Sequence, residues 1–201
     1  IGGKCLIDWT VDLVLASQLI TQVIITSPDA QVLDYARSNY SEVVLHERDV
    51  QLARINTAIE DTALEALDFF KMNAEEPDAL LMLYIEAPFR STMYMDKAIN
   101  TFQLYDVDVV DGVRSDNDIF YVHGGNGLEL WHKDSRLRLE REELYRRAGG
   151  IHLVRTSTLM KTRDMLGGRI GHIFLDQQAA FSIKSELDWD IAELISNRGE
   201  G

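Results

Sequence analysis

The sequence contains few of the features that mark specialised classes of protein. It has one cysteine, Cys5, so these residues form neither an intrachain disulfide nor a cysteine-based zinc site. No run of apolar residues reaches the length that crosses a bilayer, and no charged-then-apolar leader opens the sequence. We therefore expect a protein without a membrane partner, and the cytoplasm is its expected location.

Basic residues are also few relative to acidic residues. The 20 Lys and Arg residues face 33 Asp and Glu residues, which gives a formal net charge of −13. Non-specific binding to nucleic acid or to an anionic membrane depends on a positive potential, so we expect neither partner. A small anionic substrate would need a local cluster of basic side chains against this acidic background.

The composition is that of one globular domain, which we expect to span residues 1–201, with 46% hydrophobic and 26% charged residues. Short apolar runs alternate with segments whose apolar residues have helical spacing. Strands are expected near residues 22–26, 42–46, 78–85, 106–113, 150–156 and 169–175. Helices are expected near residues 5–20, 27–40, 55–72, 91–105, 157–166 and 186–197. This alternation predicts an α/β fold with a doubly wound, mostly parallel sheet.

Residues 114–150 interrupt the alternation. They begin with short strand-like pieces around the turn GGNG and then become highly charged, which favours a hairpin or arm that projects from the sheet. The glycine-rich turn lacks the strand-to-helix context of a phosphate-binding loop. The five histidines show no metal-ligand spacing, and His152, inside an apolar strand, is expected to be a packed side chain.

Two arginines, Arg48 in HERD and Arg90 in EAPFR, lie just past expected strands. In an open parallel sheet, ligands bind beyond the carboxyl ends of the strands, and a guanidinium group suits phosphate or carboxylate. The alternative is that each arginine caps a helix or pairs with an acid. Ser27 and Asp29 follow another strand, where they can cap the next helix or line the same edge. In the last helix, Ser185 is the expected N-cap, and the Asp188 carboxylate is expected to be stabilised by the positive end of the helix dipole.

Six segments carry a resemblance when they are read in order. They are GGKCLIDWTVDLVLAS, VIITSPDAQVLDYA, ERDVQLA, LMLYIEAPFRSTMYMDKAINTF, LYRRAGGIHLVRTSTL and FSIKSELDWDIAEL. Together they resemble the acylneuraminate cytidylyltransferases, the CMP-sialic acid synthetases and their relatives. The family patterns are similar to GKPLIxWTIexAlxS, VIVSTDSeeIaevA, xRPxeLA, LLQPTSPLRxxexIdxAixxF, vYxxNGAIYIxxxxxL and SIDIDTELDWxiAEyl. The resemblance covers nearly the whole chain.

The resemblance implies a nucleotide-diphospho-sugar transferase-like fold and a transfer of CMP from CTP to a nonulosonic, sialic-type sugar acid, with release of pyrophosphate. It implies Mg²⁺ as cofactor and a homodimer in which residues 114–150 reach the partner's sugar site. It places Arg48 on the nucleotide, and Tyr84, Glu86, Arg90 and Arg138 at the sugar. Ser27, Asp29 and Asp188 are weaker candidates at the same edge.

The sequence also departs from the family. The metal-binding aspartates are replaced by Ser182 and Lys184, and a lysine cannot ligate Mg²⁺ at neutral pH, although it can contact phosphate. Ile55 stands for a family aspartate, and Ala58 or Ile59 for a nucleotide-binding serine. The family opens with a strand and a loop similar to IPARGGSKxxPxKN, so we expect either that this strand precedes Ile1 or that another segment fills its place.

Three alternatives therefore stay open: a diverged enzyme, a catalytically degenerate homologue that binds sugar or nucleotide, and a glycosyltransferase. The last would need a D-x-D motif at the end of a strand. Asp106 and Asp108 lie instead before the apolar core of theirs.

Overall fold

The computed structural model of this chain describes residues 1–54, 56–72, 75–116, 118–131 and 144–198. Its helices are α1 (Leu6–Leu15), α2 (Ala30–Asn39), the 3₁₀ helix η1 (Val50–Ala53), α3 (Ile59–Lys71), α4 (Thr92–Tyr105), α5 (Thr156–Thr162) and α6 (Glu186–Arg198). Its strands are β1 (Ile24–Ser27), β2 (Val44–Glu47), β3 (Ala79–Leu83), β4 (Val109–Asp116), β5 (Tyr121–His123), β6 (Leu128–Leu130), β7 (Leu144–Arg155) and β8 (Ile170–Phe174).

The strands form one four-stranded sheet and two smaller pairs. The main sheet has the order β3-β7-β4-β8, and β1 pairs in parallel with β2 beside it. The expected α/β class is confirmed, with β4 parallel to β8 and β7 antiparallel to both of its neighbours. β7 runs in the opposite direction because the chain returns from β4 through a hairpin-like arm, and strands joined in that way are antiparallel.

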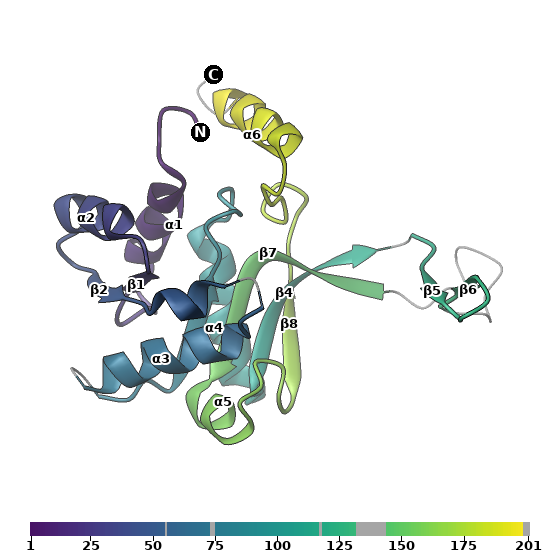
Figure 1. The fold of residues 1–201 in the computed structure, drawn as a ribbon, viewed down its shortest axis with the longest axis horizontal. Coiled ribbons are helices and arrows are strands. Elements are labelled where there is room, and N and C mark those ends of the chain that lie inside the picture. The colour runs from purple at the N-terminus through teal and green to yellow at the C-terminus, as the bar shows by residue number, and fades with distance from the viewer. Residues whose placement is uncertain (55, 73–74, 117, 132–143, 199–201) are drawn as a thin grey trace.

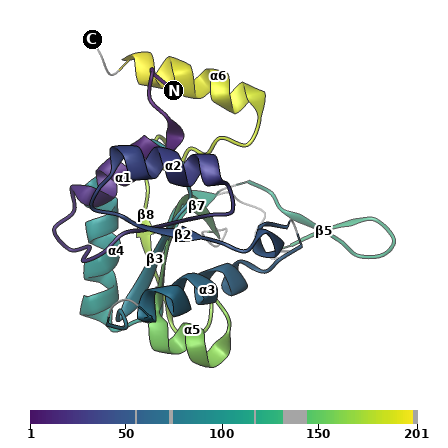
Figure 2. The same cartoon turned by 60° about the vertical axis from the view of Figure 1, so that its left-hand side comes forward.

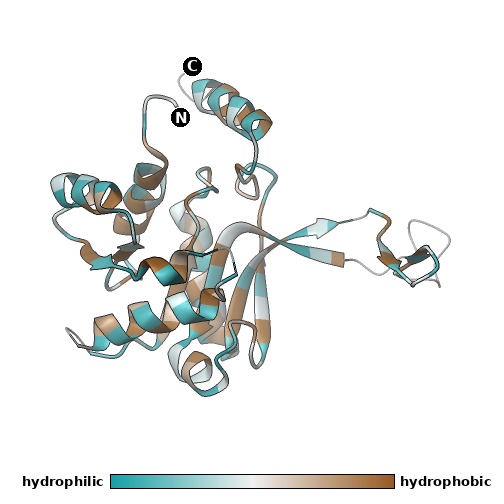
Figure 3. Ribbon diagram, in the orientation of Figure 1, coloured by the Kyte–Doolittle hydropathy of each residue, from teal (hydrophilic) through white to brown (hydrophobic). Residues whose placement is uncertain are grey.

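Helices cover both faces of the main sheet, so the molecule has three layers (Figures 1 and 2). On one face, α4 packs through Tyr94, Ala98 and Phe102 against the strands. On the other face, Ala63 of α3 and Leu159 of α5 complete a second core cluster. Figure 3 shows hydrophobic residues concentrated along the part of the strands that lies between these layers.

The arm leaves the sheet where β4 and β7 run on as a ribbon toward the hairpin β5–β6 (Figure 1). The register of β4 against β7 shifts between Asp111 and Val113, which is the position of a β-bulge. In the hairpin, the backbone N–H of Gly124 donates to the carbonyl of Gly127, so the glycine-rich turn is a hairpin turn as expected. Arg138 lies outside the described residues.

Membrane insertion was not expected from the sequence. Within the described ranges, no helix combines the length and apolar character that spanning a bilayer requires.

Candidate functional site

A polar cluster lies on β4 and β7, the two central strands of the main sheet. Asp111 of β4 lies opposite His152 of β7, and its Oδ1 is 2.5 Å from Nδ1 of the imidazole. Arg147, further along β7, places Nε 3.1 Å from Oδ1 of Asp111 and Nη2 3.2 Å from Oδ2. This two-point contact fixes the plane of the guanidinium group, which is the geometry that binds carboxylates and phosphates most specifically.

The cluster has a buried end and an open end. Asp111 and His152 are buried, and His152 is only 1% exposed, whereas the Arg147 side chain is 41% exposed. Nδ1 of His152 must carry a proton to donate to the Asp111 carboxylate, so Nε2 is the acceptor in the neutral ring. Nε2 is buried and has no hydrogen-bond partner among the described residues. Arg147 is therefore the member of the cluster that a ligand can reach.

Tyr84 follows β3 and lies next to this cluster. Burial raises the pKa of its hydroxyl, Arg147 acts to lower the pKa, and the carboxylates of Glu86 and Asp111 raise it. Tyr84 is half-buried, and its backbone N–H donates to the carbonyl of Gly150 across the sheet edge. Tyr84, which the resemblance assigns to the sugar together with Glu86, thus lies in the electrostatic field of both Arg147 and Glu86.

Arg90 has a different environment from the other basic residues. It is 4% exposed, and its Nη1 donates to the carbonyls of Gly149 and Gly150, while Nη2 donates to Oγ1 of Thr10. Burial lowers its pKa to about 10, and the charge of Glu86 opposes that shift. These contacts tie α1 and the loop after β3 to β7, so both terminal nitrogens of Arg90 are used inside the protein.

Two glycines make this packing possible. Gly150 has φ +55°, and a Cβ there would lie 2.9 Å from Cβ of Tyr84 and 3.1 Å from Nη1 of Arg90. Gly149 has φ +67°, and its Cβ would lie 2.3 Å from Cδ1 of Leu175. Both positions therefore need a residue that adopts a left-handed backbone and has no side chain.

The residues after β1 and β2 meet at the same edge. The Asp29 carboxylate accepts from the backbone N–H of Gln31 as the cap of α2, and the Asp29 N–H donates to Oγ of Ser27. The Arg48 backbone N–H donates to the carbonyl of Ser27, which fixes Arg48 at the end of β2. The Nε of Arg48 is buried without a hydrogen-bond partner in the described part of the chain. Capping therefore accounts for Asp29, while the role of Arg48 on a nucleotide stays a prediction.

The segment that replaces the family's metal-binding motif lies against the end of β3, because the N–H of Ile183 donates to the carbonyl of Glu86. The Asp188 carboxylate accepts from Oγ of Ser185 and from the N–H of Lys184. These hydrogen bonds lower the pKa of Asp188, with the bond from Ser185 as the largest cause. Asp188 and Ser185 form a reciprocal cap at the start of α6, as expected for Ser185.

The donor set of this segment does not fit Mg²⁺. Lys184 brings a positive charge to the position of a carboxylate ligand, and Asp188 is engaged in capping. In the described ranges, no three His, Cys, Asp or Glu side chains are grouped so that they could hold a metal ion. We therefore derive no chemical step through a metal at these residues.

The Asp111–His152–Arg147 cluster was not recognised from the sequence as a site. A signal was present, because Asp111 and His152 each interrupt an apolar strand, and a buried polar group needs a partner. Pairing the two residues required the strand register, which the residue pattern alone does not supply.

Comparisons with known proteins agree on the fold. No family model matches the chain. Post-translational flagellin modification protein B of Campylobacter coli is 23% identical over 188 residues, which cover 89% of this chain and 78% of that protein. The solved 4-diphosphocytidyl-2C-methyl-D-erythritol synthase of Anaerococcus prevotii is similar with a TM-score of 0.71 at 14% identity, over 97% of this chain and 87% of the other.

A third comparison involves a nucleotide complex. CMP:2-keto-3-deoxy-manno-octonic acid synthetase complexed with CTP matches with a TM-score of 0.70 at 10% identity, over 98% of this chain and 89% of that one. The chain has the fold of the cytidylyltransferases. This cytidylyltransferase fold confirms the nucleotide-diphospho-sugar transferase-like architecture that the sequence resemblance implied.

Proposed function

We propose that the protein is a nucleotidyltransferase that transfers CMP from CTP to a nonulosonic, sialic-type sugar acid and releases pyrophosphate. The observation that carries the proposal is the likeness to a synthetase complexed with CTP over 98% of the chain. The six ordered motifs of the sequence add the acidic sugar as the acceptor class.

The polar cluster supplies the chemistry that an acidic acceptor needs. Arg147, held by Asp111, presents a fixed positive charge to the sugar carboxylate, and Tyr84 and Glu86 offer hydrogen bonds to its hydroxyls. Arg48 at the end of β2 is assigned to the nucleotide phosphates. The anomeric hydroxyl attacks the α-phosphate, the bond to pyrophosphate breaks, and the hydroxyl proton is released to water or to a neighbouring base.

The arm supports the proposal of a homodimer. Its described residues expose large apolar side chains, among them Phe120, Tyr121, Leu128 and Leu130. A two-stranded hairpin is marginally stable by itself and needs a surface against which it can pack. A second copy of the chain is the partner that we assign to this surface.

A second candidate function is sugar or nucleotide binding without turnover. The observation that favours it is the replacement of two metal-binding carboxylates by Ser182 and Lys184. The two candidates differ in one measurable property, which is the release of pyrophosphate.

The experiment is an assay of pyrophosphate release by the full-length protein with CTP and N-acetylneuraminic acid, alongside calorimetric binding of each compound. We expect Arg147→Met to reduce kcat/KM for the sugar acid by about 10- to 100-fold, which is the size of a lost charge-assisted hydrogen bond. Most of the loss is expected in KM, because the guanidinium binds a carboxylate that does not react.

The matched control is Arg146→Met. Arg146 is the neighbour of Arg147 on β7 and pairs with Asp116 at 3.5 Å, with a side chain 60% exposed. The Arg146→Met variant should keep kcat/KM within about twofold of the parent value, since exposed ion pairs contribute little. Equal effects of the two variants would remove Arg147 from the proposed sugar site, and binding of both compounds without pyrophosphate would select the second candidate.

A further inference from the structure

The turn that follows β2 carries Arg48, and its backbone is held from two sides. The N–H of Arg48 donates to the carbonyl of Ser27 in β1 at 3.0 Å. The N–H of the next residue, Asp49, donates to Oε1 of Glu65 in α3 at 3.3 Å. Asp49 also caps η1 through its side chain. We call this segment, residues 48–51, the arginine turn.

One stripe of α3 faces β2 and the arginine turn. It consists of Thr62, Glu65 and Phe69, which lie three and four residues apart and therefore on one side of the helix. Oγ1 of Thr62 donates to the carbonyl of Leu52 in η1 at 3.4 Å. The Phe69 ring stacks on the ring of His46 in β2, with centroids 4.4 Å apart. Glu65 is the acidic member of this stripe.

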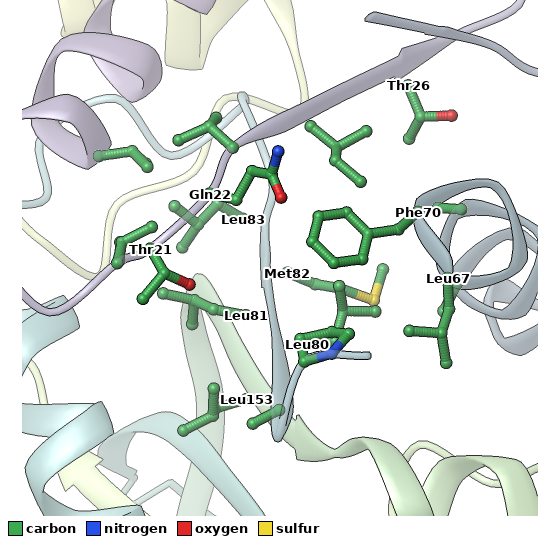
Figure 4. Close-up of a pocket in the computed structure, with 18 of the residues that line it drawn as sticks. Thr21, Gln22, Thr26, Leu67, Phe70, Leu80, Leu81, Met82, Leu83 and Leu153 are labelled. Carbon is green, nitrogen blue, oxygen red and sulfur yellow. The ribbon is translucent and has the colours of Figure 1, made fainter. Parts of the chain in front are cut away.

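The neighbouring stripe of α3 docks the helix. Leu67 and Phe70 line the pocket in the gap between β1 and β3 (Figure 4). Leu67 is 1% exposed, and Ala63 belongs to the core cluster beneath α3. Because apolar burial holds α3 in place, removal of the Glu65 carboxylate should leave the helix where it is.

His46 lies next to Glu65 and is itself buried. Its Nδ1 is 3.0 Å from Oγ1 of Thr26, and its Nε2 is 3.9 Å from Oε1 of Glu65. A nitrogen lone pair would repel the carboxylate, so the neutral ring carries its proton on Nε2 and accepts from the Thr26 hydroxyl at Nδ1. The imidazole thereby places a second N–H near Oε1, in addition to the N–H of Asp49.

Stability alone does not account for the Glu65 carboxylate. The side chain is 30% exposed, yet its Oε2 is buried and has no hydrogen-bond partner among the described residues. A buried carboxylate oxygen without a partner has lost its hydration, which costs stability. The group that this carboxylate does hold is the backbone of the arginine turn.

The Arg48 side chain has no comparable support. It is half-buried, and its Nε is buried without a hydrogen-bond partner in the described ranges. The place of the guanidinium group therefore depends on the backbone that carries it. A displacement of about 1 Å at a group that positions a substrate can cost about 100-fold in rate.

We propose that Glu65 is a positioning residue, which holds the arginine turn so that Arg48 meets the phosphates of CTP. The proposal rests on the assignment of Arg48 to the nucleotide in the proposed function. In the pattern xRPxeLA a proline stands where this chain has Asp49. Proline fixes φ at about −65° and has no N–H, whereas Asp49 has φ −55° and an N–H bonded to Glu65. The bond to Glu65 thus gives an aspartate the fixed conformation that a proline ring provides.

The first experiment measures Kd for CTP by calorimetry, and KM for CTP and for N-acetylneuraminic acid. Glu65→Ala removes the acceptor, so Kd and KM for CTP should rise about tenfold, while KM for the sugar acid stays within about twofold. Glu65→Gln keeps an oxygen that accepts from Asp49, and its Kd should stay within about threefold of the parent value. Asp68→Ala is the matched control, because Asp68 is exposed one turn further along α3, and its constants should change by less than about twofold.

Variants at Asp49 test the hydrogen bond itself. In Asp49→Ala the N–H remains, so adding Glu65→Ala should still raise Kd for CTP about tenfold. In Asp49→Pro the N–H is absent and φ suits proline, so adding Glu65→Ala should change Kd by less than about twofold. Arg48→Met is a third background in which Glu65→Ala should have no further effect, because Glu65 acts through Arg48.

Hydrogen exchange gives a readout that needs no ligand. The amide of Asp49 should exchange at least about tenfold faster in Glu65→Ala, and close to the parent rate in Glu65→Gln. Circular dichroism of each variant checks that the protein is folded.

Three results would overturn the proposal. They are an unchanged Kd for CTP in Glu65→Ala, an equal rise in KM for both substrates, and an effect of Glu65→Ala that persists in full in the Arg48→Met background. A parent protein that binds no CTP would overturn both this proposal and the proposed function. A parent that binds CTP but releases no pyrophosphate would refute the transfer alone, and the binding measurements would still decide the role of Glu65.

Discussion

Individual basic residues differ in their contacts. Arg147 is held by a carboxylate and half-open to solvent, whereas Arg90 is enclosed and bonded to main-chain oxygens. A guanidinium group with both terminal nitrogens engaged positions the backbone. A guanidinium group that is anchored along a single side, as that of Arg147 is, can also bind a ligand.

We therefore predict that Arg90→Met lowers the free energy of unfolding by about 2 kcal/mol. The loss of a buried charge is favourable, but the carbonyl of Gly149 loses the Arg90 donor and that of Gly150 keeps only the N–H of Tyr84, and an unsatisfied buried acceptor costs about 1–3 kcal/mol. Urea unfolding measures the change. Arg163→Met is the control, because Arg163 is 67% exposed in its pair with Asp61, and we expect a change within about 0.5 kcal/mol. Equal stability of both variants would show that the Arg90 contacts are dispensable.

The sequence was most informative about residues that act locally. The caps at Asp29 and Ser185 follow from short-range patterns, and both are present. Arg48 and Arg90 were equivalent in the sequence, since each follows a strand, and only the contacts of the folded chain distinguish them. Asp111 and His152 are 41 residues apart, so no local pattern could pair them.

At the scale of elements, the glycine pair at positions 149 and 150, inside β7, sets the geometry of the site. Gly150 has φ +55° and lies against Tyr84 and Arg90, so backbone conformation and side-chain space both require glycine there. A side chain would displace the two residues that connect β3 to the polar cluster.

We predict that Gly150→Ala destabilises the protein by about 3 kcal/mol and reduces binding of the sugar acid. The left-handed backbone accounts for about 1 kcal/mol, and the contact with Tyr84 at 2.9 Å for the remainder. Gly125→Ala separates the two causes, because Gly125 has φ +86° and no atom within 4 Å of its Cβ position. It should cost about 1 kcal/mol without affecting binding. A loss of stability in Gly150→Ala that is no larger than the loss in Gly125→Ala would refute the steric part of this explanation. Thermal unfolding and calorimetry provide the readouts.

Element type and order were predictable, whereas pairing was not. Apolar runs and helical spacing located the strands and helices within a few residues of their observed bounds. The same patterns do not encode strand direction, so the antiparallel course of β7 and its extension back to Leu144 are visible only in the structure. The gap between β1 and β3 likewise depends on the spatial order of strands.

For the whole molecule, the arm and the main sheet form two exposed apolar regions. Tyr145 of β7 stacks on His172 of β8, Phe174 of β8 contacts both rings edge to face, and Phe174 is 46% exposed. The hairpin β5–β6 lies apart from the main sheet (Figure 1), and its apolar side chains are exposed. Exposed apolar patches of this kind mark surfaces that other chains cover.

We predict a homodimer at micromolar concentration that Leu128→Asp dissociates, with at least a tenfold rise in the dimer dissociation constant. Leu128 is 70% exposed on the hairpin, and a charge there would be desolvated in an interface. Light scattering after size exclusion measures the mass. Leu104→Asp, at a residue 76% exposed on α4, should leave the mass unchanged. A monomeric parent protein would contradict the assignment of a second copy to the arm.

The negative net charge of the molecule restricts how it can bind anionic substrates. With a net charge of −13, the chain can attract CTP and a sugar acid only through local cationic groups at the sheet edge. Its fold is similar to that of solved cytidylyltransferases, and the function proposed for the chain depends on group transfer at that edge.

The most direct measurement is pyrophosphate release by the full-length protein with N-acetylneuraminic acid and each of the four ribonucleoside triphosphates in turn. We expect release with CTP at a rate at least tenfold above the rates with the other three, and we expect release to require the sugar acid. Absence of release with every triphosphate would contradict the claim that this protein is a cytidylyltransferase.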